Sequence, residues 1–228
     1  FIITPTNDTL KMKKIVIHQP DFLPWLGFFD KISRADKFII LDDVQFARRG
    51  WTHRDLIIIK KEKKWLTVPT KKLNYYDKIN KIEISYNADW INNHYNLIKE
   101  GYKNEKNFNN IIDEIMKIYN KKFDLLIDLN IALLRFVMKK LKIKKEIKLS
   151  SSFNLNYNSS EKIIELIKIT NSNYYITGKP SAKYLDEEKF KKNGIKIEWY
   201  NIKDGIFSGK LNEINPDVSS LDYIMKYD

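Results

Sequence analysis

The stretch His18–Ile32, HQPDFLPWLGFFDKI, follows directly on the short apolar run Ile15–Ile17. Pro20 and Pro24 fix their own φ angles and lack a backbone donor, so the chain between strand and helix must form a rigid, shaped turn. A turn that follows a strand is a common place for a binding site in α/β proteins. The aromatic residues of the stretch, Trp25 among them, fit equally well a helix start that simply packs.

The segments around this stretch alternate between strand and helix patterns. A strand is predicted at Lys14–His18, a helix at Leu23–Arg34 and a second strand at Lys37–Leu41. The runs NYYITG (173–178) and IKIEWYN (195–201) predict two further strands late in the chain. This order is typical of a mostly parallel sheet with flanking helices, so the sequence predicts an α/β fold.

The middle of the chain follows other patterns. DLIIIK (55–60), a lysine-rich turn and WLTVP (65–69) predict an antiparallel strand pair, with a further strand around Lys81–Ile84. This pair reads as an antiparallel addition to the sheet. From Asp89 to about residue 142 the apolar positions follow the helical period, which predicts three helices inserted into the α/β pattern.

After the polar loop SSSFNLNYNSS (150–160), either Ser159 or Ser160 is expected to cap a helix that runs through Ile169. We expect a single α/β domain over residues 13–228. Residues 1–12 are expected to be a flexible leader or a cloning remnant, because Met12 is the more natural start.

The composition excludes several classes of protein. With no cysteine, neither disulfides nor thiolate metal sites are possible, and an all-histidine metal site would require each of the three histidines. No apolar run approaches the roughly 20 residues that a membrane span needs, and no signal-peptide pattern is present. We therefore expect a cytoplasmic protein without a transmembrane segment.

The net charge of +12 invites a nucleic-acid interpretation. The lysines are scattered along the chain, however, and stretches such as LKIKKEIK (141–148) are typical of solvated helix faces. We therefore rank a basic nucleic-acid binder last among the candidate functions. Arginine is clustered instead: Arg48, Arg49 and Arg54 lie within seven residues of one another. Planar, forked donors in one loop suit a carboxylate or a phosphate, although surface solubility is an alternative.

Ligands of open α/β sheets bind at the carboxyl ends of the strands. The polar or small residues just past the predicted strands are His18, Gln19, Asp42, Asp43, Gln45, Thr177, Gly178 and Ser181. His18 fits a general base and equally a structural histidine. Asp42 and Asp43 fit a magnesium site or an amine-orienting pair, while a cap or turn role fits one of them as well.

Five blocks of the chain, in order, resemble the WbqC-like proteins: IHQPDFLPWLGFFDKI (17–32), ADKFIILDDVQFARRGWTHRD (35–55), WLTVP (65–69), TGKPSAKYLD (177–186) and NPDVSSLD (215–222). The resemblance runs from about Lys13 to Asp222. His53 and Asp55 depart from it, because asparagines are expected around the arginine there.

The resemblance implies a role in bacterial surface-polysaccharide synthesis, O-antigen included. The implied activity is a transferase that passes a small acyl or amino-acid group, such as glycine, to a nucleotide-linked amino sugar. The alternative is a non-catalytic sugar-nucleotide-binding or scaffold protein of the same pathway. On the first interpretation His18 and Asp43 are catalytic, and the substrate-binding residues are Gln19, Asp21, Trp25, Asp42, Gln45, Arg48, Trp51, Arg54, Thr177, Gly178, Ser181 and Tyr184.

The order of strand, proline turn and second strand is also similar in outline to the nucleotide-binding half of pantothenate synthetase. Enzymes of that type activate a carboxylate with ATP and pass it to an amine, so ATP and magnesium are conceivable cofactors here. The diagnostic HxGH pattern is missing, because Phe28 follows Gly27.

Overall fold

The computed structural model describes residues 12–72, 74–210 and 215–227, so the predicted leader lies outside the described residues except for Met12. In this part of the chain a five-stranded sheet has the order β5-β2-β1-β6-β7, and each neighbouring pair is parallel. A separate antiparallel pair is formed by β3 and β4. The α/β class is therefore confirmed. The strands are β1 (Lys14–His18), β2 (Lys37–Ile40), β3 (Arg54–Ile59), β4 (Glu62–Thr67), β5 (Ile147–Leu149), β6 (Tyr174–Gly178) and β7 (Lys196–Tyr200).

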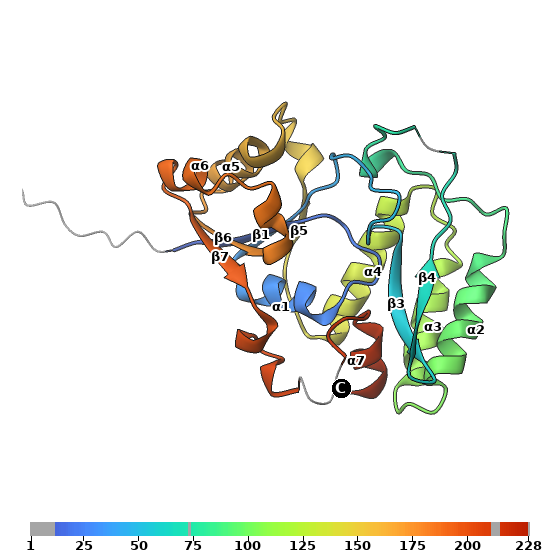
Figure 1. The fold of residues 1–228 in the computed structure, drawn as a ribbon. Coiled ribbons are helices and arrows are strands. Elements are labelled where there is room, and N and C mark those ends of the chain that lie inside the picture. The colour runs from blue at the N-terminus through green and yellow to red at the C-terminus, as the bar shows by residue number, and fades with distance from the viewer. Residues whose placement is uncertain (1–11, 73, 211–214, 228) are drawn as a thin grey trace, which may run out of the picture.

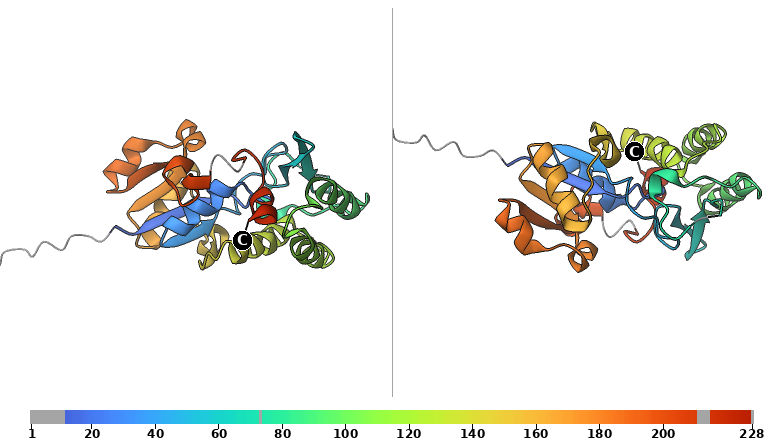
Figure 2. Two further views of the ribbon diagram at one scale, coloured as in Figure 1. Left: turned by 90° about the horizontal axis from the view of Figure 1, so that it is seen from below. Right: turned by 90° about the horizontal axis from the view of Figure 1, so that it is seen from above.

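Helices cover both faces of the sheet. Because side chains alternate along a strand, Ile15 and Ile17 of β1 pack in the core under α5 (Ser159–Ile169) and α6 (Glu187–Lys192), whereas Val16 belongs to the core on the opposite face. That opposite face is covered by α1 (Leu26–Arg34). Figure 2 shows α1 on the side seen from below and α5 on the side seen from above.

The hairpin and the inserted helices lie beyond the carboxyl ends of the sheet strands (Figure 1). The core on the α1 face continues into this region, since one cluster of buried side chains includes Val16 of β1, Ile57 of β3 and Leu133 of α4. The three predicted helices are confirmed, and a short helix near the carboxyl terminus packs against them. They are α2 (Trp90–Tyr102), α3 (Phe108–Tyr119), α4 (Leu126–Lys140) and α7 (Leu221–Lys226).

Four local predictions need correction. Helix α1 begins at Leu26 and not at Leu23, whose φ of 43° is left-handed. The stretch Lys81–Ile84 forms isolated bridges after a short 3₁₀ helix instead of a strand.

The lysine-rich stretch 141–148 was predicted to form a solvated helix face. It lies after the end of α4 and leads into β5 instead. Asn158 precedes α5 at the cap position and makes no side-chain cap bond. The Ser160 hydroxyl instead donates to the Tyr184 carbonyl and accepts from the Asp186 amide. These contacts join α5 to the loop at Tyr184–Asp186, which is more than 20 residues away and therefore outside the reach of local capping rules.

Candidate functional site

The proline turn is clamped from two sides. The Phe22 amide donates to the Trp51 carbonyl at 2.9 Å. The side-chain amide of Asn130, on α4, donates to the carbonyls of Pro20 and Thr52, both at 2.7 Å. Asn130 is completely buried. The turn and the loop that leads into β3 are thereby held in one fixed arrangement.

The carboxyl-terminal segment holds the far end of the same turn. The Ser219 hydroxyl donates to the Leu23 carbonyl at 2.6 Å, and the Ser220 amide donates to the Pro24 carbonyl at 3.0 Å. These contacts satisfy carbonyls that the prolines and the left-handed Leu23 leave outside regular structure. The predicted rigid turn is therefore a junction at which it meets three other segments: the loop before β3, helix α4 and the carboxyl-terminal segment.

Ionisable side chains gather around this junction. His18 Nδ1 lies 3.6 Å from a carboxylate oxygen of Asp21, and the His18 ring meets the Phe28 ring edge-on at 4.8 Å. Lys31, on α1, places its Nζ 5.9 Å from the centre of the Phe28 ring. Asp55 begins the buried face of β3. We call His18, Asp21, Lys31 and Asp55 the turn cluster.

The surroundings change the pKa values of the turn cluster. Burial raises the pKa of Asp21 to about 7 against the opposing charge of Lys31. Burial lowers the pKa of Lys31 to about 8, while Asp21 acts to raise it. Burial raises the pKa of Asp55 to about 8; the Leu56 amide opposes this shift, and the charge of Asp21 adds to it. Three of these groups therefore exchange protons near neutral pH.

His18 is neutral at that pH. Burial, together with the charge of Lys31, holds its pKa well below the ordinary value, although its hydrogen bond to the Gln19 carbonyl acts the other way. The 3.1 Å contact to that carbonyl assigns the proton to Nδ1. Nε2 then carries the lone pair and can accept a hydrogen bond.

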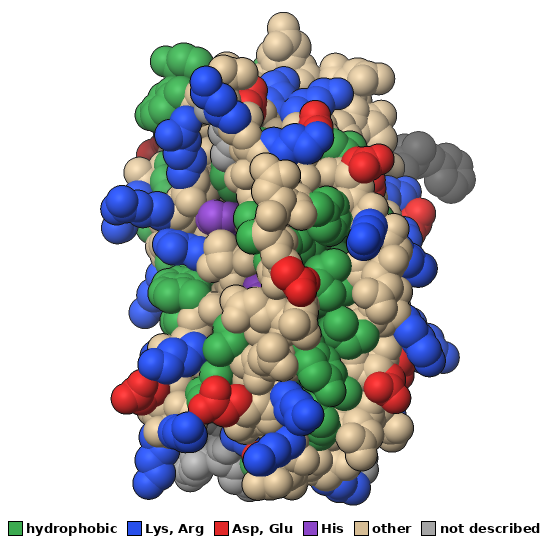
Figure 3. Space-filling model, turned by 90° about the vertical axis from the view of Figure 1, so that its right-hand side faces the viewer, with side chains coloured by type: hydrophobic (Ala, Val, Ile, Leu, Met, Phe, Trp, Pro, Cys, Tyr) green, Lys and Arg blue, Asp and Glu red, His purple; other side chains and the backbone are tan. Residues whose placement is uncertain are grey.

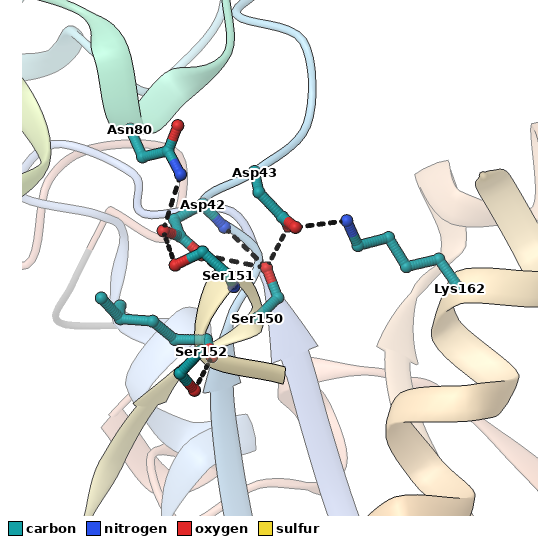
Figure 4. A network of polar contacts seen from close by, with 8 residues as sticks. Asp42, Asp43, Asn80, Ser150, Ser151, Ser152 and Lys162 are labelled. Carbon is teal, nitrogen blue, oxygen red and sulfur yellow. Dashed lines mark hydrogen bonds and ion pairs between the residues drawn. The ribbon is translucent and has the colours of Figure 1, made fainter. Parts of the chain in front are cut away.

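Asp42 is bound into a structural network (Figure 4). Its carboxylate accepts hydrogen bonds from the Ser150 hydroxyl, from the amide and hydroxyl of Ser151, and from the Asn80 side chain, at 2.7–3.2 Å. Asp42 is 1% exposed. These bonds join the end of β2 to the turn after β5, which is a turn role of the kind that the sequence left open.

Asp43 forms a buried ion pair in the same network (Figure 4). Lys162 Nζ, on α5, lies 2.5 Å from its carboxylate. The Ser150 hydroxyl lies between the carboxylates of Asp43 and Asp42 and shares its one proton between them. Burial acts to raise the pKa of Asp43, but the hydrogen bonds from Lys162 and Ser150 outweigh it and the net shift is downward. Asp43 is thus an ionised, paired carboxylate.

These partners do not fit a magnesium ion. The donors around Asp42 and Asp43 are hydroxyl, amide and ammonium groups, which occupy the carboxylate oxygens that a magnesium ion would need. Across residues 12–72, 74–210 and 215–227, no three histidine or acidic side chains are grouped closely enough to hold a metal ion.

An aromatic and cationic surface lies on the hairpin side of the junction. The Arg54 guanidinium lies over the Trp65 ring at 4.2 Å and donates to the Arg49 carbonyl at 2.8 Å. The rings of Trp51 and Trp65 are 5.5 Å apart, and both are more than two-fifths exposed. Lysine and arginine side chains are spread widely over this end of the molecule (Figure 3). We call Trp51, Arg54 and Trp65 the stacking surface.

Other predicted site residues lie elsewhere. Thr177 shares its face of β6 with Tyr175, which packs under α5, whereas His18 faces α1. The Thr177 hydroxyl donates to Ser181 at 3.0 Å. Ser181, Gly178 and the exposed Tyr184 belong to the segment on that α5 side. The residues after the strand ends, which were candidates for one site, therefore lie on two opposite faces of the sheet.

Two predicted binding residues are engaged in local contacts. Trp25 lies at the start of α1, 6.1 Å from the Tyr200 ring, and a Cβ atom on Gly27 would lie 2.2 Å from its ring. Gln45 donates to the Tyr75 carbonyl at 2.7 Å in an exposed loop. Trp25 nevertheless shares the Tyr200 ring with Lys31 of the turn cluster, whose Nζ lies 5.9 Å from the centre of that ring.

The sequence interpretation missed Lys31, Asp55 and Asn130. For Asp55 a signal existed: it shares the strand period of two with Ile57 and Ile59, which predicts an acid on a buried face. Lys31 is three residues after Phe28 in a short apolar helix, a weaker signal of the same kind. For Asn130 the signal was its place inside the apolar period of α4.

A cavity of about 430 Å³ lies apart from these groups, between α3, α4 and α7. Its lining includes Asn107, Leu141, Phe207 and Tyr223. None of the predicted site residues lines it. The histidines are also dispersed, since His94 is buried between the Tyr119 hydroxyl and the Thr67 carbonyl.

Comparisons with known proteins match nearly the whole chain. None of the helices in the described part of the chain has the length and apolar character that crossing a membrane requires. No solved structure matches the sequence. An uncharacterized protein of Mycobacterium tuberculosis, Rv1507c, is 30% identical over 217 residues, which is 93% of each chain. The model of the WbqC-like protein family matches residues 19–228, and the chain therefore belongs to the WbqC-like protein family.

Proposed function

We propose that this protein is a cytoplasmic transferase that passes a small acyl or aminoacyl group to the amine of a nucleotide-linked sugar, as a step in surface-polysaccharide synthesis. One observation carries the proposal. The loop Trp51–Asp55 presents Trp51 and Arg54 on the exposed stacking surface, and its other end, Asp55, in the buried turn cluster. A single short segment thus joins a surface suited to a nucleotide to groups that exchange protons near neutral pH.

The stacking surface suits the nucleotide part of such a substrate. An exposed tryptophan face can stack on a base, and a guanidinium forms paired hydrogen bonds to phosphate oxygens. Arg48 and Arg49 lie in the same loop as Arg54. The sugar would then extend toward the proline turn, because the Trp51 carbonyl is hydrogen-bonded to the Phe22 amide next to Asp21.

The reaction needs a neutral amine. The amine nitrogen attacks the carbonyl carbon of the donor, a carbon–nitrogen bond forms, and the bond to the leaving group breaks. The proton that the nitrogen loses passes to the leaving group. His18 is neutral and its Nε2 can accept a hydrogen bond from the substrate, so it can orient the amine for this attack.

The test is a thermal-shift and tryptophan-fluorescence titration with uridine diphosphate glucosamine, uridine diphosphate and ATP with magnesium. We expect a sugar nucleotide to raise the melting temperature and to quench fluorescence. Arg54→Gln should weaken binding about tenfold, since a charge-assisted hydrogen bond to phosphate is lost. The matched control is Arg135→Gln, because Arg135 is an exposed arginine on α4. Equal affinity in both variants would contradict the proposed surface.

The second candidate is a non-catalytic sugar-nucleotide-binding protein of the same pathway. It is favoured by the network of Figure 4, in which Asp42 and Asp43 are occupied by structural partners. A protein that binds the sugar nucleotide but transfers no acyl group from any activated donor would support this candidate over the transferase.

A further inference from the structure

The turn cluster is open to solvent on one side and closed on the other. The side chains of His18 and Asp21 are 28% and 12% exposed, respectively. Behind them, Lys31 and Asp55 are 2% and 3% exposed. A small group that enters past His18 would therefore meet Asp21 first.

Lys31 has no counter-ion of its own. In the described part of the chain no carboxylate lies within 4.0 Å of its Nζ, which contacts the rings of Phe28 and Tyr200 at 5.9 Å. The neighbouring carboxylate of Asp30 is already used, because it accepts from the Tyr200 hydroxyl at 2.6 Å and from the Ile206 amide at 2.9 Å. A lysine that is almost completely buried and has no ion pair is unusual, since burial of a charge is costly.

A second polar group beside the turn also lacks a partner. The side-chain oxygen of Asn130 is buried and accepts no hydrogen bond, although its nitrogen holds both Pro20 and Thr52. Native structures rarely contain buried polar atoms without a hydrogen-bond partner. Among the described residues, Lys31 from α1 has aromatic contacts but no ion pair, and Asn130 from α4 has a side-chain oxygen without a partner. Both lie on elements that border one junction, which favours a ligand-binding role over a purely structural one.

We propose that Asp21 is the catalytic proton acceptor for a primary ammonium group of the substrate, with Lys31 and Asp55 as positioning residues that set its charge. This inference rests on the proposed function and names the acceptor as a primary amine. The ammonium N–H bond breaks, an O–H bond forms on Asp21, and the neutral amine keeps its electron pair for the attack. The positive charge of Lys31 favours the ionised form of Asp21, which is the form that can accept a proton, and it also repels the ammonium form of the substrate. Asp55 adds a second carboxyl group on the β3 side.

The first measurement needs no ligand. Carbon-13 NMR of labelled aspartate carboxyl groups follows Asp21 from pH 4 to 9, with Asp21→Asn to assign the signal. We expect a midpoint near 7, which rises in Lys31→Met because the positive charge is gone. Lys61→Met, at an exposed turn lysine, should leave it unchanged. A midpoint below about 5 would overturn the inference, whatever the protein binds.

The closing experiment compares uridine diphosphate glucosamine with uridine diphosphate glucose by isothermal titration in phosphate and Tris buffers at pH 7. The two ligands differ in an amine and a hydroxyl group. The amine ligand should bind about tenfold more tightly and release a fraction of a proton, because Asp21 and the bound amine then share one proton. Asp21→Asn should lose both effects and still bind the glucose ligand, whereas Asp113→Asn, at an exposed position of α3, should keep them.

The outcomes separate the two proposals. Equal binding of both ligands to the wild type, without proton release, overturns the role of Asp21 and leaves the proposed function standing. Binding of neither ligand overturns the proposed function, and the inference that rests on it falls as well.

Discussion

Replacement of Asp21 by asparagine should stabilise the protein more at pH 8 than at pH 5. Asp21 is a buried acid whose folded-state pKa is raised from 3.8 to about 7. In the folded protein it therefore keeps its proton up to about pH 7, while the unfolded chain loses it above about pH 4. Stability contributed by this group is present at low pH and is lost as the pH rises between these values.

The magnitude follows from linkage. Between about pH 5 and pH 7, the folded state holds close to one proton more than the unfolded state, because Asp21 is protonated only in the folded protein. Above about pH 7 this difference disappears. At about 1.4 kcal/mol per unit, the wild type should lose about 2–3 kcal/mol of unfolding free energy relative to Asp21→Asn. The Asp21 side chain is 12% exposed, so solvent screening removes little of this effect.

The assay is urea denaturation of both proteins at pH 5, 6.5 and 8. The difference between the two free energies of unfolding isolates Asp21, because the titrations of the other groups are largely common to both. Asp113→Asn serves as control and should follow the wild type at every pH, since Asp113 is exposed on α3. A constant difference between Asp21→Asn and the wild type from pH 5 to pH 8 would refute the reasoning about the turn cluster.

Three further results are expected. Asn130→Ala should lower the free energy of unfolding in urea by about 2–4 kcal/mol, since two buried carbonyls lose their donor; a loss below 1 kcal/mol would contradict the clamp. Lys162→Met should cost about 3–5 kcal/mol because it leaves the Asp43 carboxylate buried and unpaired, and adding Asp43→Asn should restore part of that loss in a double-mutant cycle. Burial lowers the pKa of His94 to about 4, so stability falls as the pH drops below 6.5; denaturation at pH 6.5 and 4.5 should show a loss about 2 kcal/mol smaller in His94→Gln, and equal losses would argue against a neutral core histidine.

Local patterns predicted most of the regular structure. The strand at Lys14–His18 was predicted at the residues where β1 occurs, and the three helices between 89 and 142 follow from apolar periodicity. Errors fall where long-range contacts overrule local signals. β5 lies in a lysine-rich stretch that pairs with β2 across more than 100 residues, and such pairing leaves no local mark.

The candidate site was predictable in part. The proline turn and the arginine loop stand out by composition, and the strand period already places Asp55 on a buried face. The sequence could not show that Thr177 and His18 point to opposite faces of the sheet, because that depends on strand order and on which helix covers each face.

The sequence alone determines the βαβ alternation, the stiffness of the turn between Pro20 and Pro24, and the presence of basic and aromatic side chains in the loop that follows. These properties depend on residue types within a few positions of one another. The tertiary structure alone decides that Ser150, 108 residues away, occupies the carboxylate of Asp42. It also decides that Lys31 is buried beside Asp21, because the cost of burying a charge depends on every segment packed around it.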